Sequence, residues 1–466
     1  MKNRVAATAK RTNGKQLPLC SVRRILSNEE IFVIEHKERF LIYAPLRRSI
    51  LEVNAAAAAS LIKQEITGPF AAAICAAVAE NPKIVLPSRH SKSGEFEPYS
   101  VGLSLTDKCN LACAYCHANS GINGQRQLSW EIAQAALDFV IANGVRNGSC
   151  VEVTFPGPGE PTQAWDVLTR AVAYSLDKTA AHAPGCKISM STNGVFPRSK
   201  AKFIADHFTA VSLSLDGPAD IHNAHRPGAN GKGSFPAVFA TANYFFKRGF
   251  LFSIRVTVSE LSVSRMAEIW DFFETHFPGV AVSFERMNPL GRGAHSALRP
   301  PSAREFSRQF EGLMADGEKH KGLLLNSGIG KLNQIRTCFC KSLSYPCMTV
   351  TPDGQVSACQ RDGSPKFFHF GYWDEEAHAF SINPERVKFF RSLTVETFPE
   401  CVDCFAKYHC AGDCYDLRRA GIRRCSTNKS VILLDLFNKL DFDKSITSVT
   451  RNDPRYLAMS KRLHHQ

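Results

Sequence analysis

The sequence predicts an α/β fold, a partial (β/α)6 barrel of the TIM type with a small α+β unit before it and a Cys-rich domain after it. First, short apolar runs alternate with amphipathic helical windows through the middle of the chain, which is typical of parallel βαβ units. Second, a group of β-like runs at 31–54 is followed by Ala-rich helical stretches. Third, cysteines are dense in a loop-rich sequence after residue 336. Six βα units favour a partial barrel over a flat, doubly wound sheet.

The elements of this fold are assigned from their hydrophobic periods. In the N-terminal unit we expect strands at 31–36, 39–44 and 47–54 and helices at 55–63 and 70–79. In the barrel we expect strands at 101–105, 151–155, 187–191, 210–215, 253–257 and 280–286, and between them helices at 130–143, 164–176 and 263–275. A last helix is expected at 431–440.

Changes in composition divide the chain into five segments. They are a basic tail at 1–23, the N-terminal unit at 24–95, the barrel at 96–330, the Cys-rich domain at 331–440 and a C-terminal tail at 441–466. Much of the net charge of +14 lies near the N-terminus. Such a run of charge is usually a solvated tail, so we do not expect nucleic acid as a partner.

Composition also bears on the compartment. Hydrophobic residues make up 44% of the chain and charged residues 21%, the balance of an ordinary globular protein. No apolar run approaches the roughly 20 residues that span a bilayer, and residues 1–17 lack the apolar core of a signal peptide. We therefore expect a cytoplasmic protein without a membrane partner.

The sixteen cysteines indicate metal binding. Cytosolic thiols are kept reduced, so a disulfide framework is not expected. Cys20, Cys75, Cys150 and Cys186 are scattered, whereas the other twelve fall within 109–116 and 338–425. Clustered thiols in a reducing compartment point to metal.

The first group, Cys109, Cys113 and Cys116, follows the first barrel strand, where barrel active sites are built. Three thiolates on one loop can hold three irons of a [4Fe–4S] cluster and leave the fourth iron open. A catalytic metal site needs such an open position. Because His117 is adjacent, a zinc loop remains the alternative.

Around these cysteines the chain resembles the radical S-adenosylmethionine (SAM) superfamily, whose loop has the same C-x3-C-x2-C spacing. TFPGPGEPT at 154–162 is similar to the family's Gly-rich motif, with Pro158 where a first glycine is usual. STNG at 191–194 matches the segment on the ribose side of SAM. SLSLDG at 212–217, followed by IHNAHR at 221–226, resembles the anaerobic sulfatase-maturing enzymes and their peptide-modifying relatives.

The resemblance implies roles for single residues. The open iron would chelate the amino and carboxylate groups of SAM, with Gly159 and Glu160 near the amino end. Arg226 would meet the carboxylate with its planar fork. The remaining SAM contacts implied by the family are Ser191 and Asn193 on the ribose side, Ser214 at the ribose or carboxylate, and Tyr115 and Leu290 on the adenine.

The second group of cysteines contains a C-x2-C-x5-C-x3-C run, which alone is also compatible with a zinc knuckle. With Gly354 five residues before Cys359, the whole pattern resembles the SPASM extension of radical SAM enzymes that act on peptides and proteins. The resemblance implies two auxiliary [4Fe–4S] clusters. Their ligands would be Cys347, Cys359 and Cys414 with Cys340, favoured over Cys338, and Cys401, Cys404, Cys410 and Cys425.

One position departs from the sulfatase-maturing pattern. In those enzymes an Asp follows the residue that corresponds to Cys359, where this chain has Gln360, an amide that cannot act as a base. Asp362 is a candidate catalytic base in its place. An Asp before a glycine is also a common turn former, and that alternative stays open.

The N-terminal unit resembles, in pattern only, the modules that bind leader peptides in maturases of ribosomally made peptides by adding a strand to a sheet edge. A structural cap is the alternative for this unit. The whole chain is therefore expected to be a radical SAM maturase with three [4Fe–4S] clusters and SAM. Its 5′-deoxyadenosyl radical would abstract hydrogen from a residue of a peptide or protein, to give a cross-link or an oxidised side chain.

The expected partners are that peptide and an external electron donor of the flavodoxin or ferredoxin type. A sulfatase-maturing, formylglycine-generating enzyme is the first alternative. The second is a non-catalytic iron–sulfur electron-transfer protein, which leaves the SAM-like barrel motifs without a purpose. An enzyme acting on RNA is disfavoured by the SPASM-like pattern.

Overall fold

The chain forms two units, residues 1–84 together with 440–466, and residues 85–439. The computed structural model describes residues 22–26, 30–36, 38–62, 74, 76–79, 81–86, 95–121, 125–315, 324–326, 334–340, 343, 347–361, 366–442 and 448–449. Residues 1–21 of the expected N-terminal tail and part of the expected helix at 70–79 lie outside these residues, whereas residues 22 and 23 begin a strand. The division into five segments stays a prediction.

The first unit is a five-stranded sheet with the order β1-β2-β3-β4-β16. Its elements are β1 (Val22–Leu26), β2 (Ile31–His36), β3 (Arg39–Ala44), β4 (Ser49–Val53), α1 (Ala55–Ile62) and β16 (Ser448–Val449). The first four strands pair antiparallel, with Ile42 opposite Leu51, and one face packs on Ala58 and Leu61 of α1. The three predicted strands are confirmed, whereas β1 and β16, which pair with β2 and β4, were not predicted.

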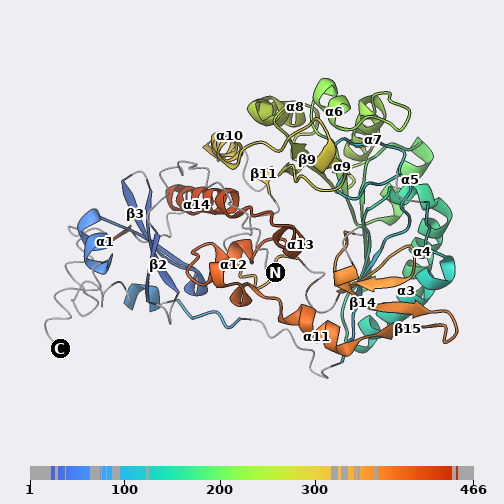
Figure 1. Cartoon of the computed structure of the whole chain (residues 1–466), viewed down its shortest axis with the longest axis horizontal. Helices are drawn as coiled ribbons and strands as arrows, with labels where there is room; N and C mark the ends of the chain where they lie inside the picture. Colours follow the sequence, from blue (N-terminus) through green and yellow to red (C-terminus); the bar gives the residue numbers. More distant parts are fainter. Residues whose placement is uncertain are drawn as a thin grey trace, which may run out of the picture. The chain divides into compact units, whose positions relative to one another are not determined.

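The second unit is built on one eleven-stranded sheet, ordered β11-β10-β9-β8-β7-β6-β5-β12-β13-β14-β15 (Figure 1). Its strands are β5 (Ser100–Leu103), β6 (Val151–Phe155), β7 (Cys186–Thr192), β8 (Ala210–Ser214), β9 (Phe252–Val258), β10 (Val282–Arg286), β11 (Leu324–Leu325), β12 (Cys347–Val350), β13 (Gln355–Ser357), β14 (His369–Asp374) and β15 (Ala379–Ile382). Strands β5 to β10 are parallel and adjacent in chain order, which confirms the partial barrel.

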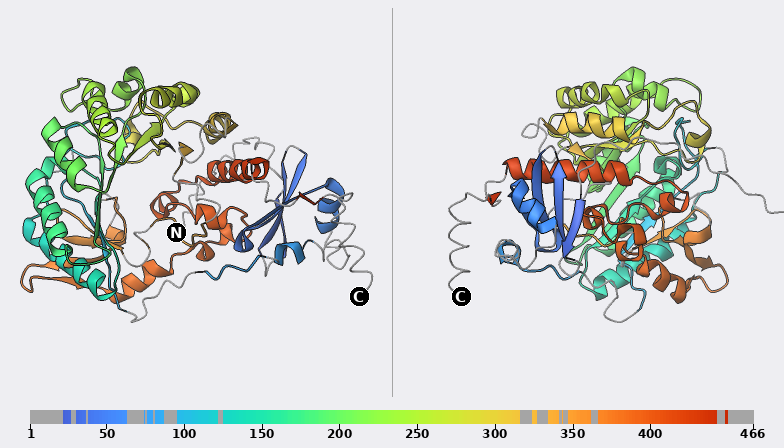
Figure 2. Two further views of the ribbon diagram at one scale, coloured as in Figure 1. Left: turned by 180° about the vertical axis from the view of Figure 1, so that it is seen from behind. Right: turned by 60° about the vertical axis from the view of Figure 1, so that its left-hand side comes forward.

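Helices α3 to α8 cover the outer side of this curved sheet, whereas α12 and α13 lie on its concave side (Figures 1 and 2). The helices are α3 (Trp130–Arg146), α4 (Trp165–Lys178), α5 (Arg198–His207), α6 (Ala219–His225), α7 (Phe235–Lys247), α8 (Met266–His276), α9 (Arg292–His295), α10 (Ala303–Ala315), α11 (Pro384–Ser392), α12 (Lys407–Cys410), α13 (Tyr415–Arg419) and α14 (Cys425–Phe442). In the described part of the chain, no helix combines the length and apolar character that crossing a membrane requires.

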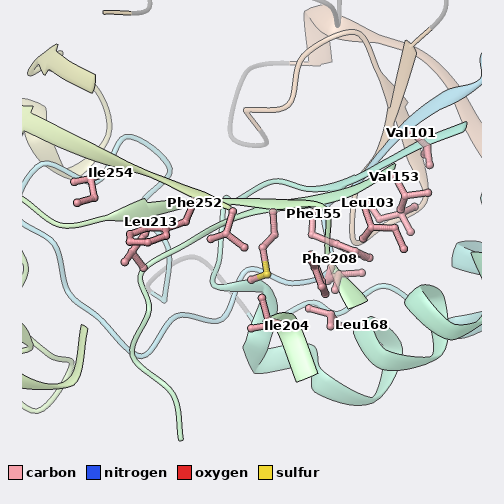
Figure 3. Packing of buried hydrophobic residues seen from close by; sticks show 14 of the residues in the cluster. Val101, Leu103, Val153, Phe155, Leu168, Ile204, Phe208, Leu213, Phe252 and Ile254 are labelled. Carbon is pink, nitrogen blue, oxygen red and sulfur yellow. The ribbon is translucent and has the colours of Figure 1, made fainter. Parts of the chain in front are cut away.

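Side chains alternate between the two faces of each strand, which explains both the buried core and the cavity of the barrel. In β9, Ile254 and Val256 are fully buried in the core beneath the helices, as Figure 3 shows for Ile254. Arg255 and Thr257 therefore point to the other side, where they line a cavity. Other inner positions of β9 and of the strands β7, β8 and β10 carry small hydroxyl side chains: Ser191, Ser212, Ser214, Ser253 and Ser283. Branched apolar residues usually fill this position in a TIM barrel, so small residues here leave room for a ligand.

The sequence did not predict that the C-terminal segment extends the barrel sheet. Strand β12 pairs in parallel with β5, with Cys347 opposite Ser100 and Val350 opposite Leu103. Strands β13, β14 and β15 then continue the same sheet antiparallel. The region expected to be loop-rich thus contributes four strands to the sheet that carries the barrel.

Core packing can be tested at Leu168, which lies on α4 and is fully buried (Figure 3). We expect Leu168→Ala to lower the free energy of unfolding of the iron-free protein by about 2–5 kcal/mol, because it removes buried contacts and leaves a cavity. Denaturant titration followed by circular dichroism measures the change. The matched control is Leu251→Ala, whose side chain is 65% exposed. An equal loss in both variants would contradict the packing.

Candidate active site

A cavity of about 350 Å³ opens at the carboxyl ends of the parallel strands. It brings together ten of the residues that the sequence analysis named: Cys109, Cys113, Tyr115, Cys116, Gly159, Glu160, Ser191, Asn193, Ser214 and Arg226. They come from the loops or ends of four consecutive strands, β5 to β8, so residues up to 117 positions apart in the chain meet at one place. His117 and Gln360 also line this cavity.

Arg292, the first residue of α9 after the last barrel strand, holds the cysteine loop in place. Its Nη1 donates to the carbonyl of Cys113 at 2.9 Å, its Nη2 to that of Ser120 at 2.9 Å, and its backbone N–H to that of Cys116 at 2.8 Å. The sequence analysis missed Arg292. The local signal is the sequence GRG at 291–293, in the loop that follows β10. It is too weak to predict that Arg292 binds the cysteine loop.

The three thiols of this loop suit a metal-bound state. Burial raises the pKa of Cys109 to about 12. Burial also raises the pKa of Cys113, against the opposing positive charges of Arg226 and Arg292. The thiolate is the form that binds metal, and burial disfavours it. The positive charge of iron bound at this loop would stabilise the thiolates. Their chemistry and convergence therefore fit an iron–sulfur cluster.

Gly159 allows the loop after β6 to approach the cysteine loop. Its N–H donates to the carbonyl of Thr106 at 3.1 Å, and that of Glu160 donates to the carbonyl of Lys108 at 2.8 Å. A Cβ atom at residue 159 would lie 2.2 Å from the Thr106 oxygen and 2.5 Å from the Lys108 oxygen. Only glycine permits this contact, so the residue is required by backbone packing as well as by any ligand.

Glu160 is buried and its carboxylate fastens two loops together. Oε1 accepts from Thr162 N at 3.2 Å, Thr162 Oγ1 at 2.8 Å and Thr192 Oγ1 at 2.8 Å, and Oε2 accepts from Asn193 N at 2.8 Å. Burial raises the pKa of Glu160, and these hydrogen bonds oppose the shift. Asn193 in turn donates from Nδ2 to Asn110 Oδ1 at 2.8 Å, which connects the loop after β7 to the cysteine loop.

Asp216 holds the other wall of the cavity, and the sequence analysis assigned it no role. Its Oδ2 accepts from Tyr115 Oη at 2.6 Å and Arg226 Nε at 2.9 Å and lies 3.2 Å from His225 Nδ1, while its Oδ1 accepts from Thr257 N at 2.9 Å. Burial acts to raise the pKa of Asp216, but Arg226 and His225 hold that pKa well below its usual range. A fully buried carboxylate thus stays ionised.

Arg226 is a buried residue and not a surface charge, with 7% of its surface exposed. Its guanidinium carbon lies 5.0 Å from the centre of the Tyr115 ring, and Nη1 lies 3.9 Å from Cys113 Sγ. The bond from Nε to Asp216 fixes the plane of the fork. One end of Arg226 is therefore anchored while the other reaches the cysteine loop.

Of the described residues named in the sequence analysis for SAM contact, Leu290 does not line the cavity. Of the described residues after β10, Met287 and Asn288 line the cavity, whereas Leu290 does not and lies in the turn that leads to α9. Asp362 lies outside the described residues. Gln360, next to it in sequence, lines the cavity.

The distal cysteines gather in two groups. In the first, burial, followed by the charges of Cys359, Cys338 and Cys414, raises the pKa of Cys340. The register of β12 with β13 pairs Thr349 with Ser357. Cys347 is the first residue of β12, and Cys359 follows the last residue of β13 by two positions, so both lie near this pair of strands. Gly354, in the turn between these strands, has a φ of +75°, which explains the glycine of the G-x4-C pattern.

The second group combines Cys401, Cys404, Cys410 and Cys425, whose thiols act on one another electrostatically. Burial raises the pKa of Cys401 to about 11 and that of Cys410 to about 12. Asn428 Nδ2 donates to Cys410 Sγ at 3.2 Å. Among the described residues, no three His, Cys, Asp or Glu side chains stand arranged to hold a metal ion.

Comparison with known proteins matches residues 103–272 to the radical SAM superfamily. The mycofactocin maturase MftC of Mycolicibacterium smegmatis is 28% identical over 275 residues, 56% of this chain but only 64% of that protein, less than two thirds of its length. The cysteine-type anaerobic sulfatase-maturating enzyme of Clostridium perfringens is 25% identical over 359 residues, 70% of this chain and 89% of that enzyme. The structure of anSMEcpe with bound AdoMet has a TM-score of 0.57 at 19% identity, covering 78% of this chain and 98% of that one, and shares the fold.

The role of Asp216 predicts a large loss of stability on neutralising it. We expect Asp216→Asn to lower the free energy of unfolding of the iron-free protein by about 3–5 kcal/mol, because Arg226 is left as an uncompensated buried charge. The control Asp220→Asn changes a carboxylate that is 63% exposed and pairs with Arg265, and it should cost no more than about 1 kcal/mol. Chemical denaturation measures both. Equal losses of stability in the two variants would show that Asp216 does not stabilise the cavity wall.

Proposed function

From the radical SAM domain that the chain carries over residues 103–272, we propose that it is a maturase that modifies a peptide or protein substrate. The observation that carries the proposal is the meeting of Cys109, Cys113 and Cys116 with Gly159, Ser214 and Arg226 around one cavity. The names of the relatives, a mycofactocin maturase and a sulfatase-maturating enzyme, support a peptide or protein as substrate.

Cys109, Cys113 and Cys116 would hold a [4Fe–4S] cluster with one iron open to SAM. When bound, cluster and SAM together would supply a 5′-deoxyadenosyl radical, which removes a hydrogen atom from the substrate. The chain's own contribution is orientation and exclusion of water. Arg226, set by Asp216, would bind the carboxylate of SAM, and Ser191, Asn193 and Ser214 would line its ribose.

The implied adenine contacts of Tyr115 and Leu290 are part of the proposal with one refinement. The Tyr115 hydroxyl is already bonded to Asp216, which leaves its backbone and ring for contact. Glu160 would act mainly by holding the loops around the amino end of SAM, because four donors already occupy its carboxylate.

The distal thiols would hold two auxiliary [4Fe–4S] clusters. Cys340, Cys347, Cys359 and Cys414 form the first ligand set, and Cys401, Cys404, Cys410 and Cys425 the second. Cys340 is the proposed fourth ligand, favoured over Cys338; the charges of Cys359, Cys338 and Cys414 all act on its thiol. An electron donor of the flavodoxin or ferredoxin type and a reducing, cytoplasmic compartment complete the proposal.

Sulfatase maturation is the second candidate, because this chain covers 89% of the Clostridium perfringens enzyme. Gln360 weighs against it, since the side chain at the cavity wall is an amide without proton-accepting capacity. Oxidation of a Cys or Ser in a sulfatase peptide to formylglycine, detected by mass spectrometry, would favour this candidate over other peptide modifications.

Metal content tests the cluster assignment. Anaerobically reconstituted protein should hold about twelve iron and twelve sulfide per chain, from three clusters of four. Replacing Cys109, Cys113 and Cys116 by Ala should remove about four of each and abolish SAM cleavage, because the open iron is lost. Iron and sulfide assays with chromatography of 5′-deoxyadenosine measure this. The control Cys186→Ala, at the start of β7, should keep both. Zinc in place of iron would contradict the proposal.

Binding of SAM tests Arg226. We expect Arg226→Gln to weaken binding of SAM to the reconstituted enzyme by about 1.5–3 kcal/mol, the range for a hydrogen bond to a charged group. Anaerobic equilibrium dialysis gives the affinity. Arg248→Gln, which alters a surface arginine paired with Asp206, is the control for loss of positive charge. Equal affinities for the two variants would mean that Arg226 only supports the wall.

A further inference from the structure

A second set of charges lines the cavity beyond those used above. Arg255, Arg286 and Arg361 come from β9, the end of β10 and the loop after β13. Register places Arg255 beside Ser214 on one neighbouring strand and beside Ser283 on the other, on the inner face of the sheet. The three guanidinium groups therefore meet the same enclosed space.

The Arg255 guanidinium differs from the other two in its contacts. Arg361 Nη1 lies 3.4 Å from Asp416 Oδ2, and Arg286 donates from Nε to the carbonyl of Pro301 at 2.7 Å. The Arg255 side chain, in contrast, makes no hydrogen bond or ion pair with any residue that the structure describes. It is solvent-exposed into the cavity while its neighbours Ile254 and Val256 are completely buried.

The cavity wall has an excess of positive charge. Four arginines line it and only two carboxylates, Glu160 and Glu285. Glu160 is occupied by its four donors, and Glu285 accepts from Ser283 Oγ at 2.9 Å and lies 4.0 Å from Arg424. Arg255 and Arg361 line this cavity together with His117, so both guanidinium groups face the same space.

We propose that Arg255, supported by Arg361, is a subsite for a carboxylate of the peptide substrate. The guanidinium fork matches a carboxylate with two parallel hydrogen bonds, and a partly desolvated site strengthens them. The inference rests on the proposed peptide substrate and specifies its chemistry. The carboxylate is either an Asp or Glu side chain or the C-terminus of the peptide, and the experiment separates these sources.

The test uses reconstituted enzyme saturated with SAM and three blocked tripeptides as probes. Acetyl-Ala-Glu-Ala-amide carries only a side-chain carboxylate, acetyl-Ala-Gln-Ala only a C-terminal one, and acetyl-Ala-Gln-Ala-amide none. Anaerobic calorimetry or ligand-observed NMR gives the affinities. We expect one carboxylate probe to bind about tenfold more tightly than the uncharged probe.

Variants tie this preference to the residue. Arg255→Gln should abolish the tenfold preference, and Arg255→Lys should restore part of it, since a lysine keeps the charge but loses the fork. Arg304→Gln, an exposed arginine on α10, removes the same charge elsewhere and should keep the preference. Iron content and thermal unfolding of each variant verify that it is folded.

Two outcomes overturn the subsite. One is equal binding of all three probes to wild-type enzyme that cleaves SAM, which leaves the proposed function intact. The other is a larger loss of SAM affinity than of carboxylate preference in Arg255→Gln, which would assign Arg255 to the carboxylate of SAM itself. Failure of wild-type enzyme to bind iron or cleave SAM would instead overturn the proposed function.

Discussion

The cavity depends on the buried carboxylate of Asp216. Its oxygens meet groups from three places in the chain, Tyr115 on the cysteine loop, His225 and Arg226 at the end of α6, and the backbone of Thr257 on β9. Without this anion, the cysteine loop, the end of α6 and strand β9 would each leave a donor or a cation unpaired away from water, and such a group is costly. The same carboxylate fixes the plane of the Arg226 guanidinium.

Glu160 is the buried carboxylate that connects the loops on the opposite wall of the cavity. It joins the loop after β6 to the end of β7, and Gly159 beside it touches the backbone of the cysteine loop. The loop that carries Cys109, Cys113 and Cys116 is thus held on one side by Gly159 and Glu160 and on the other by Arg292. A thiol loop braced from both sides needs little rearrangement to receive a metal cluster.

The sequence predicted those strands and site residues that depend on patterns between residues close together in the chain. Strands β5 to β10 follow from alternation with helices, and Cys109, Gly159 and Arg226 follow from spacing within motifs. Asp216 stood inside one of those motifs, yet its partner Tyr115 lies 101 residues away, and no local period encodes such a bond. The pairing of β12 with β5 was missed for the same reason, since it joins residues 247 apart. Met287 and Asn288 line the cavity and Leu290 does not, so the expected contact of Leu290 with adenine stays a prediction.

The continuity of the sheet from β5 to β12 limits how far two groups of thiols can move apart. Cys347 begins the strand that is hydrogen-bonded to β5, the strand that leads into the loop of Cys109, Cys113 and Cys116, and the pair Arg424 and Asp413 lies beside Glu285 of β10. Groups attached to neighbouring strands of one sheet cannot swing apart as separate domains on a linker do. If clusters form at both places, as proposed, folding alone would set the tunnelling distance between them.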